Sequence, residues 1–307
     1  MGVVRKRILV LMSSYNGEQY IAQQIVSIME QQTQYELVLR IRDDGSQDAT
    51  CAVIEGLQKK YPGRIELIRG NNIGYNASFF DLLGNAQGYD FYAISDQDDV
   101  WLPDKIQTAV EALMRTGEGP ALYASTSTLV DEDLNVIGQT RGQKRPFSFY
   151  NTIVQNICPG HTQVMNGAML SLLQPPPDAS RVYVYDSWIS NMAILYGKLV
   201  FDAAPHTLYR QHRKNQLGSG SGNLGQLNSS VKHAFHGDGQ KYRAQIAYFV
   251  EKNRERLSEE NKLAELEAFL AATDFPTRLH YAIKSKLFRQ SLIETAAFRV
   301  AVIIGFF

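Results

Sequence analysis

Short apolar runs alternate with helix-like segments over the first hundred residues. Residues 7–12 and 36–42 are apolar runs with the length of buried strands. Between them, residues 18–31 repeat apolar side chains every three or four positions, the spacing of a helix that buries one face. The alternation continues with helices expected at 50–61 and 76–86 and strands at 64–69 and 90–95. This order predicts βαβ units, and so an α/β fold with a mainly parallel central sheet flanked by helices.

The chain is less regular after residue 120. We expect strands near 121–124 and 198–201, a loop followed by a helix over 139–165, and a helix over 186–196. Residues 218–222 read Gly-Ser-Gly-Ser-Gly, which is typical of a flexible linker. Residues 240–300 are poor in glycine and rich in Lys, Arg, Glu, Leu and Ala, which favours helices. We therefore divide the chain into an α/β domain over 1–218 and a linker with a helical region over 219–307, which would serve packing, a membrane surface or a dimer contact.

Polar clusters follow three of the expected strands. These clusters are Ser13–Gly17, Asp43–Asp48 and Asp96–Asp99. Ligands of open α/β sheets bind at the carboxyl ends of the strands, so the three clusters are expected to meet at one ligand-binding edge. None of them has the Gly-rich pattern of a dinucleotide oxidoreductase or of a P-loop ATPase.

Composition narrows the function further. The 31 basic residues balance the 31 acidic ones, so nothing supports a general nucleic-acid binder, and we expect no nucleic-acid partner. The two cysteines, Cys51 and Cys158, form no CxxC pair and fit a reducing cytoplasm. The apolar run after the basic N-terminus is only five residues long, and no run reaches the roughly 18 apolar residues of a spanning helix.

The acidic cluster Asp96-Gln97-Asp98-Asp99 places three carboxylates within four residues, directly after an expected strand. Their mutual repulsion is relieved by a cation or a proton. Hard carboxylate oxygens suit Mg²⁺ or Mn²⁺, which often bridge substrate phosphates. A helix N-terminus that attracts acidic side chains is the alternative interpretation, and the position after a buried strand favours the metal.

Five separated motifs resemble those of glycosyltransferase family 2, which has the GT-A fold. The matching segments are ILVLMSSYNGEQYIAQQIVSIMEQQ, RIRDDGSQDAT, NNIGYNASFFDLL, AISDQDDVWLPDKI and, later, YDSWIS with YRQHRKNQLG. The form of the last three is most similar to bacterial rhamnosyltransferases of polysaccharide assembly. The resemblance covers roughly residues 5–218 and implies a GT-A domain followed by a helical extension.

The resemblance also implies roles for single residues. Ser13, Tyr15 and Asp44 match positions that hold the donor nucleoside, with Asp44 reading the pyrimidine base. Asp96 and Asp98 match the metal-binding DxD motif at the donor diphosphate. Asp98 would be the more direct metal ligand, Asp99 would assist it, and Gln97 fills the variable place.

Two later residues complete this set. Asp186 matches the general base, although the preceding Tyr185 departs from the family, and Asp186 could instead be the N-cap of its helix. His212 matches a histidine that reaches the metal or diphosphate, although a lone histidine is more often a surface or core residue.

Acceptor contacts are the least constrained part of the site. Trp101 and Trp188 could stack on sugar rings, and they could equally be packing residues. The segment from Pro159 to Ala168, with Asn166, is expected to shape the acceptor pocket.

These assignments imply an inverting displacement that needs Mg²⁺ or Mn²⁺ and one base. The donor would be dTDP-L-rhamnose or a UDP-sugar, and the acceptor a glycan or lipid-linked glycan of cell-surface polysaccharide synthesis. The basic and apolar tail, residues 278–307, could lie on the cytoplasmic membrane face, or pack as a helix or dimer contact. The alternatives are a nucleotidyltransferase that makes nucleotide-sugars and a non-catalytic sugar-nucleotide or glycan-binding module.

Overall fold

The fold is built on one nine-stranded sheet. The structure, a computed structural model, describes residues 5–212 and 238–307. The strands follow the order β3-β2-β1-β4-β8-β6-β9-β5, and β7 pairs with β6. Their bounds are β1 Arg7–Ser14, β2 Glu36–Asp43, β3 Ile65–Arg69, β4 Phe91–Ser95, β5 Val100–Trp101, β6 Ala121–Val130, β7 Val136–Gln139, β8 Val164–Asn166 and β9 Lys198–Arg210.

The parallel part of the sheet agrees with the sequence prediction. β1 pairs in parallel with β2 and β4, and β2 with β3, so the polar clusters that follow these strands share one edge. Beyond β4, the short β8 runs antiparallel between β4 and β6. The predicted α/β fold with a mainly parallel sheet is therefore confirmed, with β8 as an antiparallel insertion.

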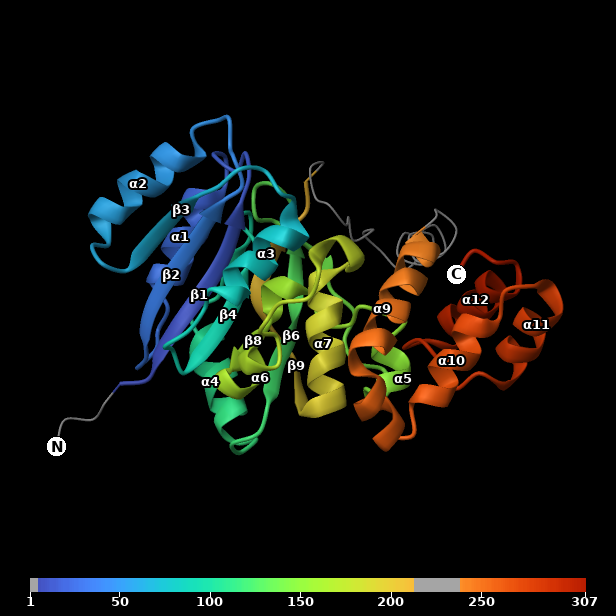
Figure 1. Cartoon of the computed structure of the whole chain (residues 1–307). Coiled ribbons are helices and arrows are strands. Elements are labelled where there is room, and N and C mark those ends of the chain that lie inside the picture. The colour runs from blue at the N-terminus through green and yellow to red at the C-terminus, as the bar shows by residue number, and fades with distance from the viewer. Residues whose placement is uncertain (1–4, 213–237) are drawn as a thin grey trace.

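Helices cover both faces of the sheet (Figure 1). Alternate residues of β1 enter different cores: Ile8, Val10 and Met12 pack with α1, α2 and α4, whereas Leu9 and Leu11 pack with α3 and α7. Burial on both faces explains why β1 is a continuous apolar run rather than an alternating one. The helices are α1 Ile21–Met29, α2 Thr50–Lys60, α3 Tyr75–Gly84, α4 Lys105–Met114, α5 Phe149–Thr152, α6 Gly167–Ser171, α7 Tyr185–Tyr196, α9 Asp238–Glu259, α10 Leu263–Ala271, α11 Phe275–Lys284 and α12 Leu292–Ile303.

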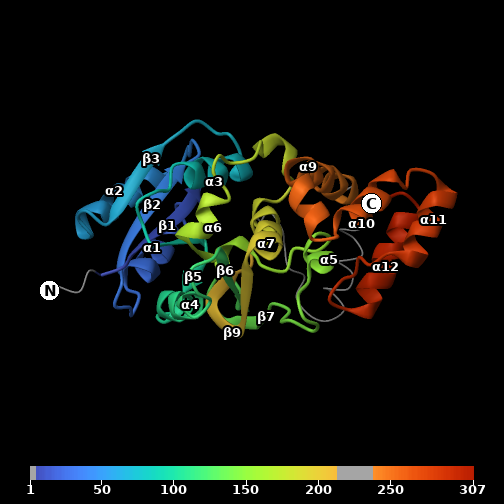
Figure 2. The ribbon, with the colours of Figure 1, turned by 60° about the horizontal axis from the view of Figure 1, so that its bottom comes forward.

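The C-terminal helices extend from the α7 side of the sheet, as Figures 1 and 2 show. Trp188 of α7 packs against Tyr248 and Phe249 of α9, with ring centroids 5.2 and 5.1 Å apart. Phe269 and Phe298 belong to the same buried cluster. The helical extension is thus joined to the sheet domain by a shared core, while the predicted linker and the boundary at residue 218 lie outside the described residues.

Two segments differ from the sequence prediction. The expected strand near 198–201 is the start of the much longer β9, which reaches Arg210. Residues 139–165 do not end in a single helix; they contain the one-turn α5, the 3-10 turn Gly160–Thr162 (η1) and the start of β8. None of the described helices is long and apolar enough to cross a bilayer.

Candidate active site

Three loops meet at the carboxyl edge of the parallel strands. The loop after β1 is joined to the loop after β2 by a hydrogen bond from the Asn16 N–H to Ser46 Oγ, at 2.9 Å. It is joined to the loop after β4 through Gln97, whose Oε1 accepts from the Tyr15 N–H at 3.0 Å and whose Nε2 donates to the Tyr15 carbonyl at 3.1 Å. The convergence expected from the sequence is therefore present in the structure.

Gln97 has a structural role that its place in the motif did not indicate. Its amide satisfies both main-chain groups of Tyr15, as a neighbouring strand would. A Cβ at Gly17 would lie 2.2 Å from Gln97 Oε1, so any larger residue there would displace the Gln97 amide from this position. Gln97 thus fixes the acidic loop against the loop after β1.

The end of β9 holds the acidic loop from the other side. Asp98 Oδ2 lies 2.9 Å from His212 Nε2, and the His212 ring stacks on Tyr20 with centroids 5.2 Å apart. Arg210 donates from its main chain to Asp99 Oδ1 at 3.2 Å and from Nε to the Asp98 carbonyl at 2.9 Å. The structure therefore brings together Asp98 and His212, two of the predicted metal ligands that are 114 positions apart.

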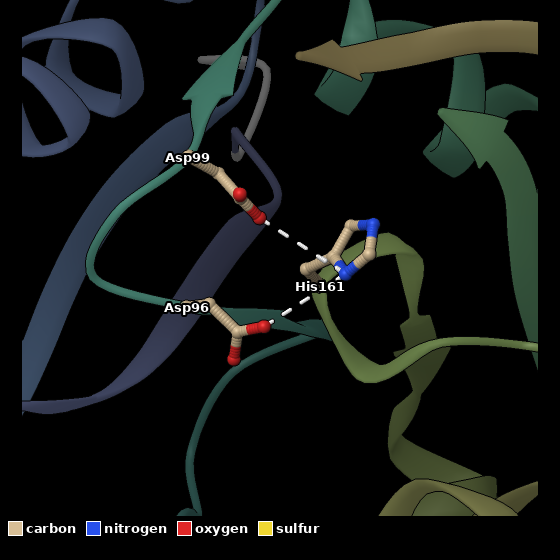
Figure 3. A group of neighbouring side chains, drawn as sticks. All are labelled: Asp96, Asp99 and His161. Carbon is tan, nitrogen blue, oxygen red and sulfur yellow. Dashed lines mark ion pairs between the residues drawn. The ribbon is translucent and has the colours of Figure 1, made fainter. Parts of the chain in front are cut away.

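Asp96, Asp99 and His161 form a second group of side chains, which Figure 3 shows directed toward one another. His161 Nδ1 is 3.8 Å from Asp96 Oδ2 and 4.0 Å from Asp99 Oδ2, and the three ligand atoms lie within 4.8 Å of one another. Asp99 Oδ2 is buried without a hydrogen-bond partner among the described residues. His161 Nε2 is occupied by Ser127 Oγ at 2.8 Å, which leaves Nδ1 directed at the carboxylates. Asp96, Asp99 and His161 could thus hold a metal ion.

The sequence predicts a metal role for Asp99, as a helper of Asp98, but none for His161. His161 is expected only as part of the segment that shapes the acceptor pocket. Nothing near His161 in the chain identifies it as a ligand, because η1 brings it to the carboxylates from 62 positions beyond Asp99.

Protonation in this cluster is governed by desolvation and like charge. Desolvation, then the charges of Asp98 and Asp186, raise the pKa of Asp96 to about 7, and the pKa of Asp99 is raised for the same kinds of reason. Burial first and Lys105 second lower the pKa of His161 to about 3, so its imidazole is neutral. A divalent cation would relieve the repulsion between the carboxylates and would find a neutral nitrogen donor.

Lys105 is a buried cation under this cluster. Its Nζ donates to Thr207 Oγ1 at 2.8 Å and to the His161 carbonyl, and it lies 4.3 Å from the Trp101 ring centroid. Burial lowers the pKa of Lys105 to about 7, although Asp99 and Asp96 act in the opposite direction. Lys105 therefore packs against the acidic loop and compensates only part of the negative charge of its carboxylates.

Asp186 lies at the start of α7, next to the same cluster. Its Oδ1 accepts from Asn156 Nδ2 at 2.9 Å and from the Ser187 N–H at 2.8 Å, and its Oδ2 accepts from the Gly160 N–H at 2.8 Å. Only 7% of the residue is exposed. Burial raises the pKa of Asp186, against the lowering effect of these hydrogen bonds. The N-cap position belongs to Val184, so the simple cap interpretation of Asp186 is wrong.

The three residues predicted to bind the nucleoside differ in exposure and in their contacts at the carboxyl edge of the sheet. Tyr15 is 46% exposed there. Ser13 Oγ lies 2.6 Å from Ser78 Oγ. Asp44 is buried, and its carboxylate is bonded to Arg42 Nη1 at 2.5 Å and to the N–H groups of Ile73 and Gly74 at 2.9 Å each. Asp44 thus holds the loop after β3 in place, and its contact with a base remains a prediction.

The acceptor residues proposed from the sequence require correction. Trp101 and Trp188 are each 3% exposed and lie in the two hydrophobic cores, so neither offers a face to a sugar. Asn166 caps α6, with its Oδ1 accepting from the Met169 N–H at 2.9 Å. It pairs with Phe91 at the amino end of β4, which is the edge opposite to the site. Of the segment 159–168, only the part around Gly160 and His161 reaches the site.

Comparison with known proteins agrees with this architecture. Residues 9–173 match the family model of Glycosyl transferase family 2. The chain is similar to the dTDP-rhamnosyl transferase RfbG of Shigella flexneri, with 27% identity over 218 residues, which cover 68% of this chain and 74% of that protein.

Two solved structures share the fold at low sequence identity. One is S. aureus TarS 1-349 in complex with UDP-GlcNAc, with a TM-score of 0.54, 15% identity, and coverage of 96% of this chain and 90% of that one. The other is the mannosyltransferase PcManGT from Pyrobaculum calidifontis in complex with GDP-Man and Mn²⁺, with a TM-score of 0.53, 18% identity, and coverage of 99% and 82%. The family match over more than half of the chain and this shared GT-A fold lead to one conclusion: the protein belongs to glycosyl transferase family 2.

Proposed function

We propose that this glycosyltransferase is metal-dependent and inverting, and that it transfers L-rhamnose from dTDP-L-rhamnose to a glycan or lipid-linked glycan in cell-surface polysaccharide synthesis. The observation that carries the proposal is the position of Asp98 with His212 and of Asp186 on one edge of the sheet. Gly160 and His161 are consecutive, and they connect the two: the Gly160 N–H binds Asp186, and His161 Nδ1 faces Asp96 and Asp99.

The residues at this edge fit Mg²⁺ or Mn²⁺. Carboxylate oxygens and imidazole nitrogens are suitable donors for such ions, and the unpartnered Asp99 Oδ2 shows that the hydrogen bonds of this acidic loop do not satisfy all of its carboxylate oxygens. Asp98 and His212, with Asp96, would hold the ion next to the donor diphosphate. A bound divalent cation neutralises the charge that develops on a departing diphosphate.

Asp186 would act as the base. Three hydrogen bonds fix its carboxylate: Oδ1 accepts two of them and Oδ2 accepts one, so Oδ2 keeps a lone pair for the hydrogen bond of an acceptor hydroxyl. Its raised pKa makes it a stronger base than a solvated aspartate. As the acceptor oxygen attacks the anomeric carbon, Asp186 would take its proton. One base without an enzyme nucleophile gives inversion of the anomeric configuration.

The choice of donor rests on the similarity to RfbG, which is described as a dTDP-rhamnosyl transferase. A UDP-sugar is the second candidate donor, because a carboxylate that accepts from uracil N3–H accepts from thymine equally well. Ser13 and Tyr15 would contact the nucleoside, and Asp44 would act directly or through the loop that it holds. The reaction would take place at the cytoplasmic face of the membrane, where a lipid-linked acceptor presents its glycan.

A thermal-shift screen tests this proposal. Purified protein would be heated with a panel of nucleotide-sugars, each with Mn²⁺ and with EDTA. We expect the largest rise in Tm with dTDP-L-rhamnose, and only when Mn²⁺ is present, because binding to the folded state raises Tm by mass action. An equal response to all nucleotides, or a response in EDTA, would contradict the donor and the metal assignments respectively.

A further inference from the structure

Helix α11 presents an apolar face to solvent. Phe275, Leu279 and Ile283 are 60%, 38% and 69% exposed. They are spaced by four residues and so lie along one side of the helix. The other side is occupied by Tyr281 and Ala282, which are buried. Exposed aliphatic and aromatic side chains that line up in this way are typical of an interaction surface rather than of a solvated helix.

Helix α12 repeats the arrangement. Ile293, Val300 and Ile304, which follow at helical spacing, are 63%, 48% and 47% exposed, and Leu292 is 73% exposed. Phe298, Ala301 and Val302 are buried on the side that faces the protein. Both helices thus use one apolar side for the core and leave a second apolar side uncovered.

The two helices form one fixed unit. The Arg278 guanidinium, at the start of α11, lies against Gly305, just after α12. Arg299 Nη2 donates to the Ser285 carbonyl, just after α11, at 3.2 Å. Figures 1 and 2 place this pair at the end of the molecule farthest from β2 and β3. We call the exposed side chains Phe275, Leu279, Ile283, Leu292, Ile293, Val300 and Ile304 the α11–α12 face.

The exposed charged residues within 275–307 are all basic, whereas two acidic residues from outside this range adjoin them: Asp274 caps α11, and Glu265 Oε1 accepts from the Lys286 N–H at 3.0 Å. Residues 275–307 include one acidic residue, Glu294, which is buried and paired with Arg141. His280, Lys284 and Lys286 are exposed next to the apolar side chains. The preceding residues, 238–274, are different in that acidic residues outnumber basic ones. By contrast, the segment 275–307 contains five basic side chains: Arg278, Lys284, Lys286, Arg289 and Arg299.

We infer that the α11–α12 face docks on an anionic membrane surface. An apolar stripe bordered by lysines inserts its aliphatic side chains at the headgroup boundary, while the lysines bind acidic headgroups. Self-association would cover the apolar side chains but would leave the lysines beside them unexplained, whereas an anionic surface binds both. The inference depends only on this surface and not on the chemistry of the active site.

Vesicle co-sedimentation of the full chain tests the inference. The wild type should sediment with vesicles of phosphatidylcholine and phosphatidylglycerol, and much less with phosphatidylcholine alone. Removing a basic side chain near an anionic surface costs about 1 kcal/mol, so Lys284→Glu with Lys286→Glu should reduce partitioning by at least about twentyfold. Leu279→Glu with Ile283→Glu should reduce it by at least about tenfold, because two inserted side chains are lost.

Matched variants on the catalytic domain serve as controls. Lys59→Glu with Lys60→Glu changes the same charge on the exposed end of α2, and Met114→Glu with Val136→Glu changes exposed apolar residues of α4 and β7, outside the α11–α12 face. Both should sediment like the wild type. The inference is wrong if the wild type does not bind anionic vesicles or if the controls lose as much binding as the α11–α12 variants. It is also wrong if sedimentation velocity shows a dimer that Ile283→Glu dissociates while vesicle binding is absent.

Discussion

The edge of the sheet and the α11–α12 face both hold side chains in an environment that is unfavourable for them, but the kind of side chain is opposite. At the sheet edge, carboxylates are crowded together, Asp99 is fully buried, and one of its oxygens has no partner among the described residues. On the α11–α12 face, apolar side chains such as Ile283 are left in water. Each arrangement is unfavourable by itself and becomes favourable when a ligand of suitable chemistry is added: a cation at the edge, and a lipid surface at the helices.

The largest effect is expected from removing the charge of Asp98. Asp98→Asn should lower the transfer rate at least about a thousandfold, because the metal contributes several kcal/mol of transition-state stabilisation. Glu118→Gln, on the exposed turn after α4, changes charge equally and should have no effect. Circular dichroism would establish that the fold is kept.

Two histidine variants distinguish between the two candidate metal positions at the sheet edge. If Asp98 and His212 hold the metal, His212→Ala should weaken Mn²⁺ binding, measured by calorimetry, far more than His161→Ala does. The reverse order would move the ion to the site formed by Asp96, Asp99 and His161.

Replacing Asp186 should have the next largest effect. Asp186→Asn keeps the shape of the side chain but cannot take a proton, so we expect a rate at least about a hundredfold lower with normal nucleotide and Mn²⁺ binding. Asp178→Asn, whose carboxylate caps the short turn before α7, is the matched control and should act like wild type. Near-normal turnover of Asp186→Asn would remove Asp186 from the role of base.

The pH profile of the wild type follows from the same residue. Burial raises the pKa of Asp186 above its ordinary value. Because the base must be ionised, the rate should fall as pH decreases through that raised pKa, and the acid limb should lie at higher pH than for a solvated aspartate. A rate that stays constant down to the ordinary titration range of aspartate would contradict a buried base.

A smaller effect is expected at Asp44. Asp44→Asn should weaken donor binding by about tenfold to a hundredfold, since a charge-assisted hydrogen bond contributes about 1.5–3 kcal/mol, and should change the rate of bound donor little. Asp81→Asn breaks the other ion pair of Arg42 but makes no bond to the loop that Asp44 holds, and it should bind donor normally. Unchanged affinity of Asp44→Asn for dTDP and UDP would exclude Asp44 from the donor site.

The smallest effect at the edge is expected for Gln97. Gln97→Ala removes two hydrogen bonds to Tyr15, each worth at least about 0.5 kcal/mol, and should raise the donor KM by at least about fivefold. Gln97→Glu can still accept from the Tyr15 N–H, so its donor KM should lie between that of the wild type and that of Gln97→Ala. A wild-type KM in Gln97→Ala would show that the acidic loop is held without this residue.

Much of the fold could be predicted from local sequence patterns. β1 to β4 and the helices between them follow from apolar periodicity, because each element buries its own apolar positions. β8 could not be predicted this way: it is three residues long, and its pairing with β4 and β6 is fixed by tertiary structure.

The residues of the candidate active site could be predicted only where several of them are adjacent in the sequence. The Asp96–Asp99 cluster is visible in the sequence, whereas His161 is brought to it by a turn distant in the chain. Aromatic side chains were ambiguous for a different reason. A tryptophan is equally suited to a sugar contact and to a hydrophobic core, so the residue type of Trp101 and Trp188 does not decide between these roles. Their burial in the structure does.

Release of nucleoside diphosphate tests the central claim most directly. The enzyme would be stripped of metal with EDTA, dialysed, and mixed with dTDP-L-rhamnose in the presence and absence of Mn²⁺, with Asp98→Asn measured in parallel; without a glycan acceptor, water takes the rhamnosyl group and dTDP is released. We predict dTDP release from the wild type only after Mn²⁺ is added, and none above background from Asp98→Asn. Equal release by the metal-free wild type, or full activity of Asp98→Asn, would contradict the metal-dependent mechanism.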